Sequence, residues 1–273
     1  MVSSDFRPGS PSWIGLGSPD LAESGLFYGS VFGWELGPPG PDGYGFFRSA
    51  GRAVAGVGPL TEAEPMPAWT VHFAAADAAE VAAAAERSGG TVRVGPAEEP
   101  GRARTAQLTD PTGGRFAVRE APGPEAPGPE TDGPETDGPE APEPETDGAE
   151  AAPGVLCWAE LHTSDVPGAL RFYRGLFGWR SRSSDVPGVE YTVLRPADGG
   201  EEFGGIAGVH PRVDVGWLVH FAVADALLAT DEVRRLGGSV LVPPEQVPTV
   251  GRIAVLADPF GAQFALLEPE PRR

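Results

Sequence analysis

The chain contains the same pattern twice, and this internal repeat constrains its fold more than any other feature. Three segments recur in order, at a spacing of 145 positions for the first and 148 for the other two: FYGSVFGW at 27–34 as FYRGLFGW at 172–179, WTVHF at 69–73 as WLVHF at 217–221, and DPTGGRFA at 110–117 as DPFGAQFA at 258–265. The six tryptophans form three matched pairs: Trp13 with Trp158, Trp34 with Trp179, and Trp69 with Trp217. The repeat therefore predicts two collinear copies of one module.

The length of 273 residues suits two domains joined by a linker. We expect a flexible N-terminus over residues 1–11, a first domain over 12–120, a linker over 121–153 and a second domain over 154–269. The linker repeats pentapeptides such as APGPE and TDGPE, without aromatic or branched aliphatic residues over 121–150. Such a segment buries too little apolar surface to offset the entropy of ordering, so we predict a disordered spacer.

Charge and composition exclude several classes of protein. A net charge of −19 disfavours binding to nucleic acid or to an anionic membrane. The chain has no apolar run of about 18 residues, and its N-terminus lacks the pattern of a secretion signal. Cys157 is the one cysteine, which excludes an internal disulfide or a cysteine-based zinc site. We expect a cytoplasmic protein whose partner is a small molecule.

The pattern of each copy predicts two successive units, each made of a strand, a helix and three strands. This order of elements is typical of an α+β fold. In the second copy, residues 156–163 form the first expected strand, and Ser164 or Asp165 caps the following helix. Gly178 ends that helix where a left-handed backbone is needed. In the first copy the pattern predicts helices at about residues 20–32 and 77–88.

These motifs resemble the vicinal oxygen chelate superfamily of glyoxalases, bleomycin-resistance proteins and extradiol dioxygenases. The resemblance rests on the FY-x(3)-FGW and DP-x-G-x-x-F motifs, each present twice and in the same order. It implies two domains, each of paired βαβββ units with a curved mixed sheet around a cleft. Such domains commonly pair, so we expect the two modules to form a pseudo-dimer, within one chain or between chains.

The resemblance also implies where a metal would bind. Metal-dependent members hold a divalent ion with His, Gln or Glu from the first strand of each unit and from the last strand, a donor set that suits such ions. The motif spacing transfers these positions to Trp13 and Trp158, Thr70 and Leu218, and Ala117 and Ala265. None of these side chains is a usual ligand, so we predict neither a metal site nor another cofactor.

Strand alternation places other polar and aromatic groups on the same face. A Glu–His pair in a partly apolar site can transfer protons near neutral pH, so Glu160, His220 and His162 are the candidate catalytic residues. The candidate ligand-binding residues of the two modules are Trp158, Gln263, Leu218, Trp13, His72 and Arg115.

Structural roles remain alternatives for several of these residues. His72 and His220 lie in apolar strands, where a buried histidine commonly serves packing. Glu160 is expected either to act on a ligand or to accept hydrogen bonds from loop backbone or from Arg252. The copies differ at two of these positions, because Gly15 and Gly17 of the first copy correspond to Glu160 and His162 of the second. This difference favours the second module as the working site.

Two classes of function compete. The first is a metal-independent binding protein of the glyoxalase/bleomycin-resistance type, which takes a planar aromatic or polyketide-like metabolite for sequestration, resistance or secondary metabolism. The second is a cofactor-free isomerase, cyclase, lyase or hydratase that uses Glu160 and His220 as acid and base. A metal-dependent dioxygenase or glyoxalase is the third possibility.

Overall fold

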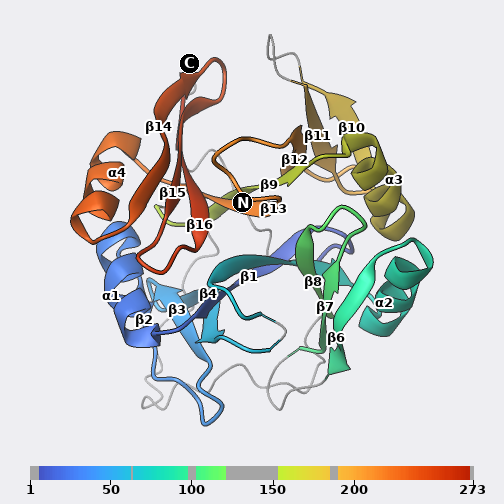
Figure 1. Ribbon diagram of the computed structural model, residues 1–273, viewed down its shortest axis with the longest axis horizontal. Helices are drawn as coiled ribbons and strands as arrows, with labels where there is room; N and C mark the ends of the chain where they lie inside the picture. Colours follow the sequence, from blue (N-terminus) through green and yellow to red (C-terminus); the bar gives the residue numbers. More distant parts are fainter. Residues whose placement is uncertain (1–5, 63, 98–102, 121–152, 185–189, 271–273) are drawn as a thin grey trace, which may run out of the picture.

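The computed structural model describes residues 6–62, 64–97, 103–120, 153–184 and 190–270 (Figure 1). Most of the predicted linker, residues 121–152, lies outside the described residues. The elements of module 1 are β1 (Pro11–Ser18), α1 (Leu21–Phe32), β2 (Glu35–Leu36), β3 (Gly45–Ser49), β4 (Arg52–Pro59), β5 (Ala68–Ala75), α2 (Ala78–Arg87), β6 (Thr91–Ala97), β7 (Thr105–Thr109) and β8 (Arg115–Glu120).

Module 2 repeats this order element by element. Its elements are β9 (Leu156–Thr163), α3 (Val166–Phe177), β10 (Arg180–Ser183), β11 (Tyr191–Arg195), β12 (Gly204–Gly208), β13 (Gly216–Ala222), α4 (Ala226–Arg235), β14 (Ser239–Val247), β15 (Gly251–Ala257) and β16 (Gln263–Pro269). Both modules therefore have the predicted succession of two βαβββ units. Among the described residues, no helix has the length and apolar character needed to cross a membrane.

Each module contains one eight-stranded mixed sheet in which its two units meet at their first strands. The strand orders are β2-β3-β4-β1-β5-β8-β7-β6 and β10-β11-β12-β9-β13-β16-β15-β14. The central strands β1 and β5 are antiparallel, while β1 pairs with β4 and β5 with β8 in parallel; module 2 repeats this pattern. The α+β class and the paired βαβββ architecture are confirmed.

Local sequence signals account for the helix ends. The Asp165 side chain accepts a hydrogen bond from the backbone N–H of Gly168 and so caps α3, with proline in the first turn. Gly33 and Gly178 end α1 and α3 with φ of 73° and 68°, a left-handed conformation that glycine adopts without steric cost. The matched FGW motifs therefore mark where each helix stops and the chain turns back to the sheet.

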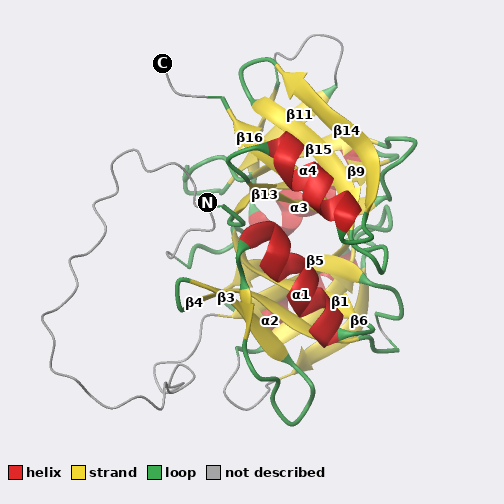
Figure 2. Ribbon diagram, turned by 90° about the vertical axis from the view of Figure 1, so that its left-hand side faces the viewer, coloured by secondary structure: helices red, strands yellow, loops and turns green. Residues whose placement is uncertain are grey.

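The two modules pack against each other within the chain through their helix-bearing faces. Helix α1 lies beside α4 and α2 beside α3, at the two sides of the molecule in Figure 1. Figure 2 shows α4 above α1, both in front of the strands in this view. One core cluster of buried aromatic and aliphatic residues spans both modules, and Phe32 of α1 contacts Phe221 of β13 with a ring separation of 4.9 Å.

Two reciprocal hydrogen bonds join the modules inside this core. The Tyr28 hydroxyl donates to Asp258 Oδ2 at 3.0 Å, and the Tyr173 hydroxyl donates to Asp110 Oδ2 at 2.8 Å. Each tyrosine oxygen also accepts the indole N–H of its own module, from Trp69 at 2.9 Å or from Trp217 at 2.8 Å. Asp110 and Asp258 thus hold their own tight turns and in addition bind the opposite module.

Part of the predicted flexible N-terminus contacts both modules. Gly9 N–H donates to the carbonyl of Ala74, and Ala74 N–H donates to the carbonyl of Ser10. The Trp179 indole N–H donates to the Gly9 carbonyl at 2.7 Å, across the module boundary. Residues 9 and 10 therefore extend β1 and pack against module 2.

Replacing either interface tyrosine by phenylalanine should destabilise the protein. Y28F and Y173F each leave a buried aspartate without its hydroxyl donor, and the loss of such a hydrogen bond costs about 1–3 kcal/mol. Urea denaturation followed by tryptophan fluorescence measures the change. Equal losses in the two variants are expected from the matched geometry, whereas an unchanged midpoint in both would contradict this role.

Candidate functional site

Each sheet has one face that points away from the core shared by the two modules, and we call it the open face. In module 2 this face carries Trp158, Glu160 and His162 of β9, because Ala159 and Leu161 point into the core. On β13 it carries Leu218 and His220, while Trp217, Val219 and Phe221 belong to the core. The structure therefore brings the three candidate catalytic residues to one face, on adjacent strands.

A hydrogen-bonded network connects four side chains of this face. The Trp158 indole N–H donates to the Tyr191 hydroxyl at 2.6 Å, and that hydroxyl donates to the Glu160 carboxylate. His162 Nε2 lies 2.7 Å from Glu160 Oε1, an ion-pair contact that lacks the alignment of a linear hydrogen bond. The pair is largely buried, with side chains 8% and 16% exposed for His162 and Glu160.

Charges within this network set the protonation of its members. Burial opposes ionisation of Glu160, but the close contact with His162, the nearby His220 and the Tyr191 hydroxyl together lower its pKa from 4.5 to about 2. Burial lowers the pKa of His220, although the Glu160 charge acts in the opposite direction. At neutral pH the face therefore holds an ionised Glu160 and a neutral His220 whose buried Nε2 has no hydrogen-bond partner.

Two predicted ligand-binding residues of module 2 are engaged by the loop before β13. The Gln263 side-chain oxygen accepts the backbone N–H of Asp214 at 3.0 Å. Leu218 is 3% exposed and packs with Val213 and Val255 in a small apolar cluster. Of the alternatives for Glu160, a hydrogen bond from Arg252 is wrong, because Arg252 pairs with Glu268 at 3.0 Å.

The open face of module 1 carries different groups. Trp13 is half-buried beside Phe46, and the Arg119 guanidinium lies over its ring at 5.3 Å. The His72 Nδ1 is buried without a partner, and burial together with the Arg119 charge lowers the His72 pKa to about 3. Arg115 is exposed at the start of β8.

Comparison with known proteins places this architecture in a family. The profile of the glyoxalase/bleomycin resistance protein/dioxygenase superfamily matches residues 156–266, and a glyoxalase-like domain profile matches residues 13–119. The chain belongs to the vicinal oxygen chelate superfamily. The anthracycline biosynthesis protein DauV of Streptomyces sp. (strain C5) is 35% identical over 96% of this chain and 94% of its own length. DnrV of Streptomyces peucetius, also an anthracycline biosynthesis protein, is similar to the same extent.

Solved structures agree with the superfamily fold. The Mn(II)-bound glyoxalase from Novosphingobium aromaticivorans has a TM-score of 0.63 at 17% identity, covering 97% of this chain and 83% of that chain. The 2,3-dioxygenase LapB from Pseudomonas sp. KL28 has a TM-score of 0.60 at 15% identity, covering 98% and 93%. At these identities the likeness shows the fold alone.

The side chains at the superfamily's metal positions do not fit a divalent ion. The strand register aligns His220 with Trp158 and Ala265, and His72 with Trp13 and Ala117. His72 and His220 lie two residues beyond Thr70 and Leu218, the positions that the motif spacing gave. Each histidine is level with a tryptophan and an alanine, and neither of these side chains can bind a metal ion. Within the described ranges, no group of three His, Cys, Asp or Glu residues could hold a metal ion.

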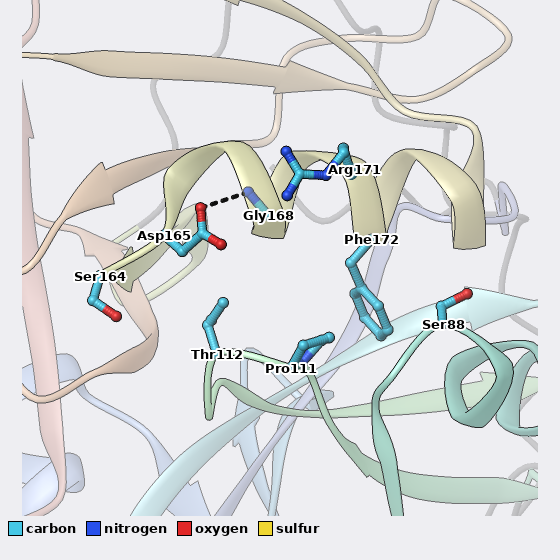
Figure 3. Close-up of a pocket in the computed structure, with 8 residues that line it drawn as sticks. All are labelled: Ser88, Pro111, Thr112, Ser164, Asp165, Gly168, Arg171 and Phe172. Carbon is cyan, nitrogen blue, oxygen red and sulfur yellow. Dashed lines mark hydrogen bonds between the residues drawn. The ribbon is translucent and has the colours of Figure 1, made fainter.

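A pocket of about 510 Å³ lies away from both open faces (Figure 3). It is formed where the turn after β7 and the end of α2 meet α3, and its lining residues are Ser88, Pro111, Thr112, Ser164, Asp165, Gly168, Arg171 and Phe172. Asp165 is committed to capping α3, through a 2.8 Å bond from Gly168 N–H to its Oδ1. The pocket therefore contains none of the candidate site residues.

Sequence reasoning missed Tyr191, which links Trp158 to Glu160. Its ring lies against β12 at Gly205, where a Cβ would come within 2.3 Å of the phenol, so only glycine allows this position. One signal was available: the four tyrosines also form matched pairs, Tyr28 with Tyr173 and Tyr44 with Tyr191. A tyrosine kept opposite a glycine-rich strand in both copies indicates contact between them.

The depressed pKa of Glu160 predicts acid sensitivity of the fold. Because its pKa falls from 4.5 unfolded to about 2 folded, the ionised carboxylate stabilises the protein above pH 4.5, and this contribution is lost as pH falls toward 2. The contribution is on the order of a few kcal/mol. Urea denaturation across this pH window should show a shallower decline for E160Q than for the unaltered protein. Parallel declines would contradict the assignment.

Proposed function

We propose that the chain binds a planar aromatic or polyketide-like metabolite on the open face of module 2, without a metal ion or cofactor. The observation that carries this proposal is the bond between Trp158 and Tyr191, which fixes two partly exposed aromatic rings side by side. Rings held in place lose little conformational freedom on binding, so stacking on them contributes its full energy to affinity.

Polar groups beside these rings suit a ligand that carries hydroxyl groups. The Glu160 carboxylate is ionised and partly exposed, so it accepts hydrogen bonds from phenolic or enolic O–H groups. The neutral His220 has a buried ring nitrogen, Nε2, that lacks a hydrogen-bond partner among the described residues. A flat ring system with hydroxyls along one edge satisfies both the stacking surface and these groups.

The relatives support this ligand class and a role in secondary metabolism. Two proteins that resemble this chain over nearly its whole length are anthracycline biosynthesis proteins. Anthracyclines are fused-ring polyketides with phenolic hydroxyls, which matches the ligand chemistry argued from Trp158, Tyr191 and Glu160.

A cofactor-free enzyme is the second candidate, and the contact between His162 and Glu160 at 2.7 Å favours it. With a pKa of about 2, Glu160 is a weak base, so it would stabilise positive charge on a neighbouring imidazole. Nε2 of the neutral His220, which has no hydrogen-bond partner among the described residues, would then accept a proton from the substrate. Turnover of a hydroxylated polyketide that is lost in H220A while binding persists would select this candidate.

Binding of a neutral planar probe tests the first candidate. We expect 2-(hydroxymethyl)anthraquinone to bind and to quench tryptophan fluorescence. W158A should weaken this binding about tenfold. A tenfold change corresponds to about 1.4 kcal/mol, which is the energy expected from one aromatic contact and the area that it buries. Affinity should be unchanged after dialysis against EDTA.

W13A is the matched control, because it removes the corresponding tryptophan from module 1 and should leave affinity for the neutral probe unchanged. Equal affinity of W158A and the unaltered protein would refute the proposed stacking surface. Binding that vanishes with EDTA and returns with Mn²⁺ would refute metal independence.

A further inference from the structure

The open faces of the two modules carry opposite charge. Module 1 presents Arg93, Arg115 and Arg119, whereas the matching positions of module 2, at a spacing of 148, hold Leu241, Gln263 and Leu267. Conversely, Gly15 of module 1 stands at the strand position that Glu160 occupies in module 2. With Glu64 counted, the described groups of the first face still carry net positive charge, in a chain of net charge −19, whereas the second face carries the carboxylate of Glu160 beside His162.

Two of these three arginines have no carboxylate partner among the described residues. Glu64 pairs with Arg93 at 3.3 Å and accepts the Thr70 hydroxyl at 3.1 Å. No carboxylate of the described residues pairs with Arg115 or Arg119. A half-buried guanidinium without a counter-charge is costly for the fold, and an anion bound beside it would relieve that cost.

Aromatic side chains surround this unpaired charge. Arg119 lies over Trp13, Trp13 contacts Phe46 with ring centres 6.0 Å apart, and Phe46 contacts Tyr44 at 5.4 Å. Gly15 adds no side chain to the strand between Trp13 and Gly17, and the Tyr44 ring lies over Gly56 and Gly58 of the neighbouring strand β4. This combination suits a planar ring bearing a negative group.

Two buried polar atoms on the same face also lack partners. His72 Nδ1 and Gln107 Oε1 are both without a hydrogen bond within the described residues. The strand register places Gln107 level with Ala117, and Ala117 level with His72 and Trp13, so all four lie in one row across the sheet. An acceptor and an imidazole in line with Trp13 can bind further polar groups of a ligand.

We infer that the open face of module 1 is a second binding site, selective for planar aromatic anions such as carboxylated or acidic phenolic ring systems. Arg119 binds the anionic group, Trp13 and Phe46 contact the ring, and Arg115 adds positive potential at the exposed edge. The chain then carries two sites, one selective for a planar anion and the other for a neutral hydroxylated ring system. This inference stands independently of the site proposed in module 2.

Anthraquinone-2-carboxylate tests the inference, because it differs from 2-(hydroxymethyl)anthraquinone by its charge. Isothermal titration with the full chain should show one site for the anion, and R119M should weaken its binding at least tenfold, since a charge-assisted bidentate contact is lost. R119M should bind the neutral probe as the unaltered protein does. W158A should weaken binding of the neutral probe and leave binding of the anion unchanged.

R87M is the matched control, because it removes the same charge from an exposed position on α2 and should leave anion binding unchanged. R119K preserves charge while losing the planar fork, so it should fall between R119M and the unaltered protein even if R119M folds poorly. Raising NaCl from about 50 to about 500 mM should weaken binding of the anion and spare the neutral probe.

Anion binding that is unaffected by R119M and R119K, or reduced as much by R87M, would overturn the inference. So would loss of anion binding in W158A, because the anion would then occupy module 2. Absence of neutral binding, with Arg119-dependent anion binding retained, would instead refute only the function proposed for module 2.

Discussion

The exchanged hydrogen bonds between the modules determine how the rest of the molecule is arranged. Tyr28 reaches Asp258 and Tyr173 reaches Asp110, in each case from a helix of one module to a turn of the other. Burial and the neighbouring aspartate both raise the pKa of each tyrosine, so the hydroxyl stays protonated and continues to donate. Because these bonds lie within a shared aromatic core, they commit one face of each sheet to the interface.

The commitment of one face leaves the other available for ligands. The helix-bearing faces are filled by matched tryptophans, tyrosines and phenylalanines, and a change there disturbs both modules at once. The open faces have no such constraint, and there the charged residues differ between the copies, while His72 and Tyr44 of module 1 match His220 and Tyr191 of module 2. An architecture of this kind allows two sites to diverge in charge while one scaffold is maintained.

The repeat, the caps and strand alternation predicted much of this structure because each is a local property of the chain. Asp165 caps α3 and Gly178 ends it as the sequence indicates, and alternation alone places Glu160 and His162 on one face. Register between distant strands is not local: pairing of β13 with β9 aligns His220, rather than Leu218, with Trp158. Loop placement is not local either, and it engages Gln263 and covers Leu218.

The sequence by itself determined the two modules, the order of their elements and the absence of usual ligands at the transferred metal positions, since these depend on residue type and spacing along the chain. Only the tertiary structure decided which side chains meet. It joined Tyr191 to Trp158 and Glu160, and it brought Arg119 over Trp13 with no carboxylate of the described residues to pair with it. The physical reason is that hydrogen bonds and charge interactions act over a few ångströms in space, and neighbours at that distance come from strands and loops far apart in the sequence.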